Sequence, residues 1–299
     1  MWSHVPVTVL DPRTRRRLAA ALGVVLVAVT LSASTAVAAA DPVLVGAGDI
    51  ADCTVTSDSQ TAALIDRIPG TVIAIGDAAY PTGATADFRD CYGPTWGRFR
   101  DRTRPAAGNH EYETADAAPY FAYFGAAAGP AGLGYYSFDL GGWHILSLNS
   151  NVAAQVGSPQ YEWARNDVAR NASACTLAMW HHPRFSSGRH GDNLQMNDIW
   201  RLLQVARAEV VLSGHDHHYE RFAPQNADGR ADPQGLRQFV AGTGGAELRP
   251  PLRVEANSEV LDGETNGVLQ LTLHANSYDW EFVPIDGQSF RDFGSGSCR

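Results

Sequence analysis

The chain has 299 residues and a formal net charge of −9 at pH 7. An acidic surface repels the nucleic-acid backbone, so we expect no nucleic-acid partner, and small anions bind only where metals or arginines reverse the local field. None of the four Cys lies in a CxxC pair, which argues against a thiolate zinc site.

The first 40 residues have the layout of a secretory signal peptide. Four arginines within 13–17 form a basic start, an uncharged apolar run follows over 18–31, and small residues at 36–40 offer a cleavage site. This run is shorter than the ~20 residues that span a bilayer, so we expect cleavage and no stable membrane anchor. The arginines also resemble a twin-arginine export signal, and an ordinary signal with extra arginines is the alternative. We therefore expect a secreted or cell-envelope protein, with 41–299 as one catalytic domain.

Apolar runs rich in β-formers alternate with segments of helical spacing along the rest of the chain. Several runs are too uniformly apolar for half-exposed strands, which indicates central strands covered on both faces. Ser158-Pro159 is typical of a helix start, with an N-cap followed by proline in the first turn. The alternation predicts an α/β fold, a layered sandwich of mixed sheets. The predicted strands are 42–47, 71–75, 135–140, 143–148, 176–180, 209–212, 238–241, 268–273 and 279–283, and the predicted helices are 57–68, 158–169 and 195–206.

Five short motifs follow these apolar runs, and each begins a turn marked by glycine or proline. They are Gly48-Asp49, Gly76-Asp77-Ala78-Ala79-Tyr80, Gly108-Asn109-His110-Glu111, Trp180-His181-His182-Pro183 and Gly214-His215-Asp216-His217. Ligands of an open α/β sheet bind at the carboxyl ends of its strands, so separate strands deliver these side chains to one rim. We expect the motif glycines to let the backbone turn sharply beside each side chain.

The motifs bring together enough donors to hold two metal ions. Carboxylate, phenolate and amide oxygens are hard donors and imidazole is borderline, so the set suits Fe, Mn or Zn and not copper(I). The candidate metal ligands are Asp49, Asp77, Tyr80, Asn109, His181, His215 and His217.

The ordered motif set resembles the calcineurin-like metallophosphoesterase superfamily over residues 41 to about 285, and within it the purple acid phosphatases. The general superfamily begins with a GDxH motif, whereas Gly48-Asp49-Ile50-Ala51 has no His and Tyr80 appears in the second motif, as in purple acid phosphatases. The resemblance implies a dinuclear centre with Fe(III) at the first ion and Fe(II), Zn or Mn at the second. It places Asp49, Tyr80 and His217 on the first ion, Asn109, His181 and His215 on the second, and Asp77 between the two.

Further roles are implied for residues beside the ligands. His110 aligns with an outer-shell His that donates to the phosphate or the leaving-group oxygen, and His190 lies where related enzymes carry another such His. His182 and Arg184 are candidates for substrate binding; the alternatives are a His182 that faces away and an Arg184 on a solvated basic edge. Two acidic residues are candidates for orienting His side chains, Glu111 and Asp216.

Four Cys in an exported chain indicate two disulfides, for which three pairings are possible. Cys53 and Cys91 each follow a motif-bearing strand closely, so we favour Cys53–Cys91 together with Cys175–Cys298.

The function predicted from these residues is hydrolysis of a small phosphate monoester, as in an acid phosphatase. A hydroxide held by the two metals attacks phosphorus in line, and His110, helped by His190, protonates or stabilises the departing alkoxide. We expect an acid or neutral pH optimum. The alternatives are a phosphodiesterase or nucleotidase on the same scaffold, and a non-catalytic exported protein that binds metal or phosphate. The intact His110 and the full ligand set argue against the non-catalytic alternative.

Overall fold

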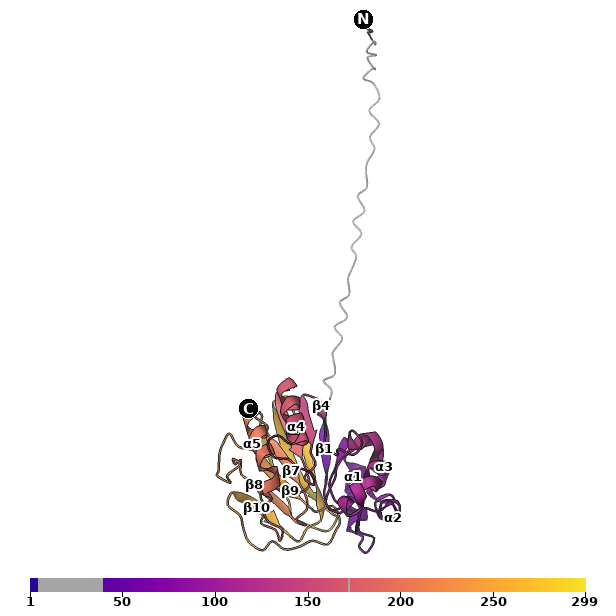
Figure 1. Cartoon of the computed structure of the whole chain (residues 1–299), viewed down its shortest axis with the longest axis vertical. Helices are drawn as coiled ribbons and strands as arrows, with labels where there is room; N and C mark the ends of the chain where they lie inside the picture. Colours follow the sequence, from indigo (N-terminus) through magenta and orange to yellow (C-terminus); the bar gives the residue numbers. More distant parts are fainter. Residues whose placement is uncertain (5–39, 172) are drawn as a thin grey trace, which may run out of the picture. The chain divides into compact units, whose positions relative to one another are not determined.

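Two mixed sheets form the centre of the fold, and helices cover them (Figure 1). The computed structural model describes residues 1–4, 40–171 and 173–299. Apart from residues 1–4 and Ala40, the signal peptide predicted for residues 1–40 lies outside the described residues. The strand orders are β13-β12-β11-β1-β2-β3 in the six-stranded sheet and β10-β8-β9-β7-β6-β5-β4 in the seven-stranded sheet.

The six-stranded sheet has a parallel part extended by antiparallel strands. β1 pairs with β2 and β2 with β3 in parallel, whereas β11 pairs antiparallel with both β1 and β12, and β13 pairs antiparallel with β12. Its strands are β1 (Val43–Ala47), β2 (Thr71–Ile75), β3 (Thr103–Ala106), β11 (Gly267–Leu273), β12 (Ser277–Pro284) and β13 (Phe293–Ser297).

The seven-stranded sheet follows the same plan. β5, β6, β7 and β9 are parallel neighbours, and β4, β8 and β10 run antiparallel to the strands beside them. Its strands are β4 (Tyr136–Leu140), β5 (Trp143–Ser147), β6 (Cys175–Met179), β7 (Val210–Ser213), β8 (Tyr219–Phe222), β9 (Arg237–Ala241) and β10 (Ser258–Asp262).

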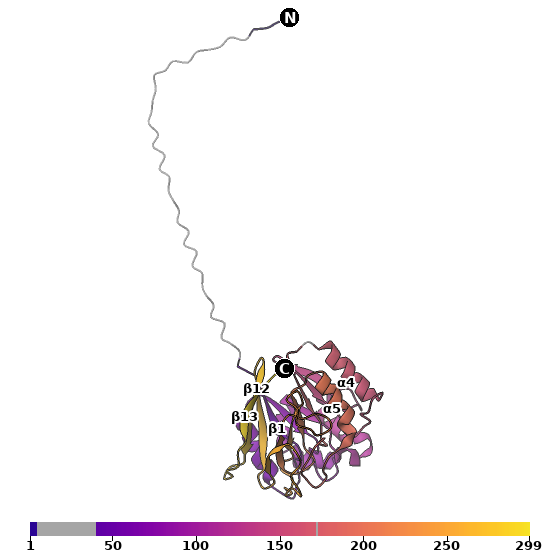
Figure 2. The ribbon, with the colours of Figure 1, turned by 90° about the vertical axis from the view of Figure 1, so that its left-hand side faces the viewer.

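Helices lie on the outer face of each sheet, which gives four layers (Figures 1 and 2). α1 (Ser57–Arg67) and α3 (Ala118–Phe124) contribute to one core with the six-stranded sheet, and α4 (Pro159–Arg170) and α5 (Asn197–Val205) contribute to another with the seven-stranded sheet. The short helical segments are α2 (Thr85–Asp87), a π-helix at Phe88–Tyr92, and 3-10 helices at Trp96–Arg102, Glu111–Glu113, Ala115–Ala117, Gly125–Ala128 and Leu194–Met196.

The central strands are buried on both faces, which explains their continuous apolar sequences. In β2, Val72 and Ala74 join the core under α1, whereas Ile73 and Ile75 join the core between the two sheets. Successive side chains of a strand point to opposite faces, so one apolar run supplies two cores. β7 divides its side chains in the same way between the intersheet core and the core under α5.

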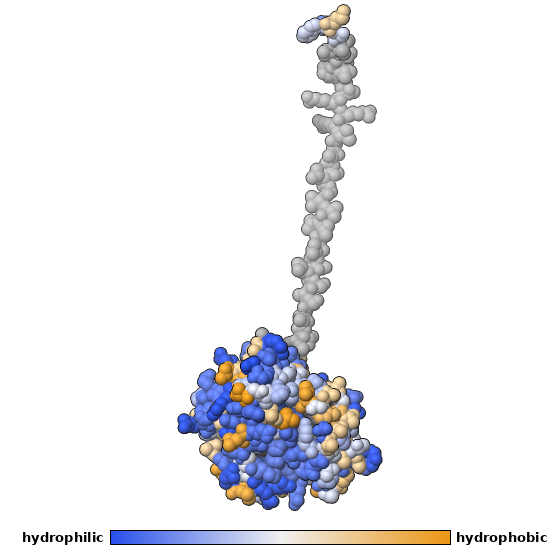
Figure 3. Space-filling model, in the orientation of Figure 1, coloured by the Kyte–Doolittle hydropathy of each residue, from blue (hydrophilic) through white to orange (hydrophobic). Residues whose placement is uncertain are grey.

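The face shown in Figure 3 is mostly hydrophilic, with apolar side chains in small groups, as is normal for a folded protein. In the part of the chain that the structure describes, no helix combines the length and apolar content needed to cross a bilayer.

Both predicted disulfides are present. Cys53–Cys91 joins the loop after β1 to the π-helix, with the two Cα atoms 5.0 Å apart. Cys175–Cys298 joins β6 of the seven-stranded sheet to the segment after β13 of the six-stranded sheet, with a Cα separation of 5.4 Å. The second bond therefore ties the two sheets together at the C-terminus.

The predicted layered α/β fold is confirmed. Each of the predicted strands and helices occurs, with ends shifted by at most two residues. The elements that were not predicted are short or irregular in sequence, and they are α2, α3, β3, β8, β10, β13, the π-helix and the 3-10 helices.

Candidate metal centre

The carboxyl ends of strands from both sheets meet at one rim. Asp49 follows β1 and Asp77 follows β2 in the six-stranded sheet, while His181 follows β6 and His215 follows β7 in the other sheet. Backbone hydrogen bonds join neighbouring ends within each sheet, from Asp49 N to the Gly76 carbonyl at 3.1 Å and from Gly214 N to the His181 carbonyl at 3.0 Å, and Gly48 N donates across the two sheets to the Ala241 carbonyl of β9 at 2.9 Å. The motifs predicted to converge on one place therefore do converge.

Three of the candidate ligands have a backbone that side-chain-bearing residues rarely adopt. The φ angles are 58° at Asp49, 48° at Asp77 and 70° at His215. A residue other than glycine in this left-handed region costs about 1–3 kcal/mol, and such residues concentrate at functional sites. Hydrogen bonds hold the strained turns, for example from His215 N to Asp49 Oδ2 at 2.7 Å.

Most of the motif glycines are required because there is no space for a Cβ, and not because the backbone turns sharply there. The prediction that they allow sharp turns holds for one of the four. Gly76 alone among the four has a left-handed φ, of 80°. A Cβ on Gly108 would lie 2.1 Å from Asp77 Oδ1, and one on Gly214 would lie 2.6 Å from Asp49 Oδ2. A Cβ on Gly48 would lie 2.7 Å from the Ile75 carbonyl oxygen. Glycine is required at these positions because neighbouring loops pack directly against the backbone.

One set of donors gathers around the hydroxyl of Tyr80. This oxygen lies 2.9 Å from Asp49 Oδ1, 3.2 Å from Asp77 Oδ2 and 3.2 Å from His217 Nε2. His217 Nδ1 donates to the Glu247 carbonyl at 2.7 Å, so in the neutral ring the lone pair is on Nε2 and faces the other donors. This set corresponds to the ligands implied for the first ion.

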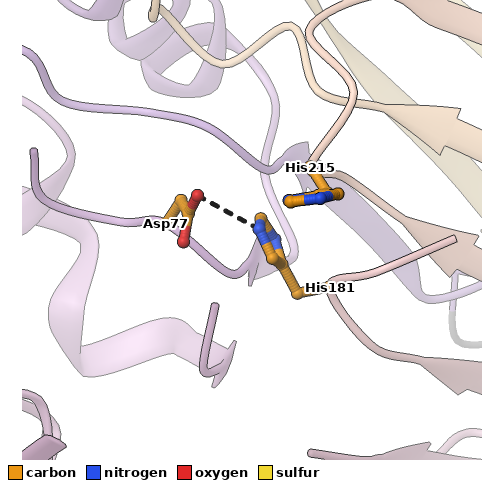
Figure 4. Close-up of side chains that lie close together, drawn as sticks. All are labelled: Asp77, His181 and His215. Carbon is orange, nitrogen blue, oxygen red and sulfur yellow. Dashed lines mark ion pairs between the residues drawn. The ribbon is translucent and has the colours of Figure 1, made fainter. Parts of the chain in front are cut away.

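A second set gathers around the ring of His181. His181 Nε2 lies 3.1 Å from Asp77 Oδ2 and 3.2 Å from Asn109 Oδ1, and its Nδ1 is 2.9 Å from the Ile75 carbonyl. Ligand atoms of Asp77, His181 and His215 all lie within 4.8 Å of one another, and Figure 4 shows the three side chains close together. This set corresponds to the second ion, and Asp77 belongs to both sets.

The charges of the cluster are matched to a bound cation. Burial raises the pKa of the Asp77 carboxyl, but the charge on His181 outweighs burial and holds this pKa well below its usual range. Burial lowers the pKa of His181, but Asp77 and Asp49 outweigh it and raise the pKa to about 10. Burial and the charge on His181 lower the pKa of His215 to about 2, so this ring stays neutral and keeps a lone pair. Buried carboxylates and neutral imidazoles are the forms that bind metal, and a metal ion would replace the His181 proton.

Glu111 and Asp216 play different parts around these sets. Glu111 is buried and bonds to no His; its carboxylate accepts the backbone N–H groups of Asp77 at 3.0 Å and Gly108 at 2.7 Å. The prediction that Glu111 orients a His was therefore wrong, because its carboxylate instead ties together two ligand-bearing loops. Asp216 Oδ1 accepts from His190 Nδ1 at 2.9 Å, so Asp216 does orient a His.

Three further histidines lie at the edge of the cluster. The His110 ring is 4.5 Å from the Tyr80 ring, and its Nε2 is 3.8 Å from Asp77 Oδ2. The rings of His182 and His190 lie 4.3 Å and 4.2 Å from the His215 ring, measured between centroids. Burial and the charge on His181 lower the pKa of His182 to about 3, so this ring is neutral.

Arg184, predicted as a substrate contact, is not brought to the cluster. It is buried, its Nε donates to Asn197 Oδ1 at 3.0 Å, and its Nη2 donates to the Ala227 carbonyl at 2.8 Å. Arg184 also does not lie on a solvated basic edge, which was the alternative prediction. Its guanidinium instead fastens the loop after β6 to α5 and to the loop after β8.

Sequence reasoning missed the segment after β5 as a part of this site. Ser150 hydrogen-bonds His182 through both the backbone N–H and the ring, and Asn151 Nδ2 donates to the Ala107 carbonyl at 3.1 Å, next to the Asn109 loop. The same signal that identified the ligands was present, because polar residues directly follow an apolar strand there.

Curated proteins with similar sequences include purple acid phosphatases and an uncharacterized bacterial protein. Purple acid phosphatase 15 of Arabidopsis thaliana is 29% identical over 219 residues, which cover 61% of this chain and 41% of that protein. An uncharacterized protein of Mycobacterium tuberculosis is 28% identical over 196 residues, covering 56% of this chain and 34% of that protein. The matched region thus spans less than half the length of both relatives.

Solved structures share the fold. The purple acid phosphatase PPD1 of yellow lupin superposes with a TM-score of 0.71 at 19% identity, covering 86% of this chain and 53% of that one. GAP50 of Plasmodium, described as the anchor in the inner membrane complex, has a TM-score of 0.67 at 13% identity and covers 87% and 90% of the two chains. A family model described as calcineurin-like phosphoesterase matches residues 37–219, and the chain belongs to this family.

Proposed function

We propose that this chain hydrolyses phosphate monoesters at a pair of metal ions, as a purple acid phosphatase. The observation that carries the proposal is the position of Asp77. One oxygen, Oδ2, lies 3.2 Å from the Tyr80 hydroxyl and 3.1 Å from His181 Nε2. A single carboxylate oxygen shared by two donor sets is what a bridged metal pair needs.

The donor sets divide the ligands between the two ions. Asp49, Tyr80 and His217 would hold the first ion, and Asn109, His181 and His215 would hold the second, with Asp77 shared. A phenolate of Tyr80 would be a hard anionic donor, which favours Fe(III) at the first ion, and the second would be Fe(II), Zn or Mn. When bound, two such ions supply Lewis-acid polarisation of the phosphate and a water acidic enough to act as nucleophile.

The protein's own contribution to the chemistry comes from the surrounding histidines. His110 lies beside Asp77 and Tyr80 with a partly exposed ring, where it can donate a proton to the leaving-group oxygen. His190 donates through Nδ1 to Asp216 Oδ1 at 2.9 Å, which fixes the orientation of the ring, and its Nε2 would assist. A small phosphate ester is the expected substrate, with an acid or neutral pH optimum.

We propose further that residues 1–40 are a signal peptide, removed on export to the cell envelope or the medium. The two disulfides support this proposal, because disulfides persist in oxidising compartments.

The test combines metal content, visible absorption and turnover on one preparation of purified protein. Two metals per chain including iron, a coloured band, and faster hydrolysis of a monoester than of a diester are expected. Tyr80→Phe should remove the band. Tyr120→Phe is the matched control, since its buried hydroxyl has no partner among the described residues.

Other outcomes lead elsewhere. Turnover by a protein without iron or colour would support a phosphoesterase but reject the purple acid phosphatase assignment. Faster hydrolysis of the diester than of the monoester would assign the protein as a phosphodiesterase. Bound metal without turnover on either substrate would favour a binding protein.

A further inference from the structure

We propose that His182 is an additional substrate-binding residue whose Nε2–H donates to an oxygen of the bound phosphate ester, and that Ser150 is the positioning residue that keeps the proton on Nε2. The inference rests on the proposed function, because it concerns the same site. It adds a fixed hydrogen-bond donor that the ligand set and the proton donors do not include.

The hydrogen bonds of Ser150 determine the tautomer of His182. The Ser150 hydroxyl oxygen accepts the backbone N–H of His182 at 3.0 Å and lies 2.8 Å from His182 Nδ1. A hydroxyl has one hydrogen, and within the described residues Nδ1 is the one acceptor that the Ser150 hydroxyl contacts. The hydroxyl therefore donates to Nδ1, and the neutral ring carries its own proton on Nε2.

The Nε2–H of His182 is available to a ligand. Nε2 lies on the side of the ring away from Nδ1 and hydrogen-bonds to none of the described residues. It is also not one of the fully buried polar atoms that lack a hydrogen-bond partner within those residues. The ring centroid lies 4.3 Å from that of His215 and 5.1 Å from that of His181. The ring of His182 is thus beside two proposed ligands of the second ion, so a phosphate ester bound there would be its neighbour.

Ser150 is held firmly enough to act as a positioning residue. It follows β5 as His182 follows β6, and these strands are parallel neighbours, so both residues emerge at the same rim. Ser150 is 2% exposed. The preceding Asn149 is fixed on both sides of its peptide by Gln160, with Asn149 N donating to Oε1 at 2.7 Å and the Asn149 carbonyl accepting from Nε2 at 2.9 Å.

His190, on the other side of His215, is arranged in the opposite way. The carboxylate of Asp216 can only accept, so His190 Nδ1 carries a proton. Nδ1 of His182 instead faces a hydroxyl, and the N–H of this ring is on Nε2. The two rings flanking His215 are therefore held through Nδ1 by partners of different kinds, which makes His182 and His190 non-equivalent in substrate binding.

The kinetic test uses purified, metal-loaded protein and a monoester substrate. A hydrogen bond to a charged group corresponds to about 10- to 100-fold in kcat/KM, and His182→Ala should lose this factor. His182→Gln keeps an amide donor of similar reach and should recover part of it. Ser150→Ala should lose less, about 3- to 10-fold, and should cost nothing further in the His182→Ala background, since it acts only through the ring.

Two controls separate positioning from general damage. Ser147→Ala removes another buried hydroxyl from the end of β5, one that donates to the Pro105 carbonyl at 3.1 Å, and it should leave kcat/KM unchanged. Metal content is measured for every variant, so that a lost ion is not counted as a lost substrate contact.

A readout independent of turnover comes from ¹⁵N NMR of the zinc-loaded protein with inorganic phosphate as the probe. We expect His182 in the Nε2–H form, a shift of this signal on adding phosphate, and a mixture of tautomers in Ser150→Ala. A proton on Nδ1, or unchanged phosphate affinity and kcat/KM in His182→Ala, would overturn the inference while leaving the proposed function intact. Phosphate binding through His182 without turnover on any ester would reject the proposed function and support the inference.

Discussion

The carboxylate of Glu111 accepts the backbone N–H of Asp77 at 3.0 Å, and this bond joins two ligand-bearing loops that are 34 residues apart in sequence. The same carboxylate accepts from Ala78 at 2.9 Å and from Gly108 at 2.7 Å. Asp77 has a strained left-handed backbone, and the buried Glu111 carboxylate holds its N–H group. The position of the shared carboxylate therefore depends on a residue that touches no metal itself.

Replacing Glu111 by Ala should destabilise the protein and weaken metal binding. Four buried N–H groups, those of Asp77, Ala78, Ala79 and Gly108, would lose their acceptor at about 1–3 kcal/mol each, so we expect a loss of about 3 kcal/mol or more. Urea unfolding and metal content per chain measure both effects. Glu113→Ala, at an exposed position in the same 3-10 helix, is the control and should change the free energy of unfolding by less than about 0.5 kcal/mol. Equal stabilities of the two variants would contradict the role of Glu111.

Gly108→Ala should weaken metal binding at the candidate centre, although it replaces none of the proposed ligands. The new Cβ would lie 2.1 Å from Asp77 Oδ1, so either the Asp77 side chain or the Asn109 loop must move. We expect at most one metal per chain and a turnover rate that is lower by about 100-fold or more, since a misplacement of about 1 Å can reduce the rate about 100-fold. Gly142→Ala is the matched control, because its Cβ would meet no atom closer than 4.0 Å. Full metal content in Gly108→Ala would refute the close-approach argument.

The fold and the meeting of the motif residues at one rim were predictable because both depend on local sequence signals. Uniformly apolar runs marked the central strands, and the residues directly after them are the candidate ligands that meet at the rim. β13 was not predicted, since Phe293-Gly294-Ser295-Gly296-Ser297 has little strand propensity; it is an edge strand that pairs with β12 and is followed by the Cys298 disulfide.

Contacts between distant segments could not be predicted in this way. The burial of Arg184 depends on a carbonyl 43 residues further along, and nothing near Arg184 in sequence announces it. The Ser150–His182 pair spans 32 residues and exists because β5 and β6 are neighbours. Sequence alone identified which residue types reach the rim, but the partners of each side chain followed only from strand order.

Removal of the Cys175–Cys298 disulfide should cost more stability than removal of Cys53–Cys91. The bonds close segments with sequence separations of 123 and 38 residues, and the entropy of loop closure grows with the logarithm of this separation. The double Ala variant at 175 and 298 should therefore be about 1 kcal/mol less stable than the double Ala variant at 53 and 91. Chemical denaturation of both variants under the same conditions measures the difference, and the opposite order would show that packing outweighs the chain-entropy effect.

Stability should also depend on pH through His144, which lies far from the centre on β5. Its Nδ1 and Nε2 each lie 2.8 Å from a carboxylate, of Asp139 and Asp167, and the ring is buried. Burial lowers the pKa of His144, but the two carboxylates outweigh burial and raise it above its ordinary value of 6.5. Because this pKa is higher in the folded than in the unfolded state, the charged ring stabilises the folded protein fully at pH values below the unfolded-state pKa. This contribution disappears as the pH rises through the folded-state pKa.

His144→Gln should therefore destabilise the protein more at pH 6 than at pH 9. The charged ring pairs with both carboxylates at the lower pH, whereas at the higher pH the neutral ring resembles the amide that replaces it. Urea unfolding of the wild type and the variant at both pH values measures the two differences in free energy. Because both proteins share every other titrating group, the change in this difference reports on His144 itself. A difference that stays constant, or that grows with pH, would show that the folded protein does not hold His144 in its charged form.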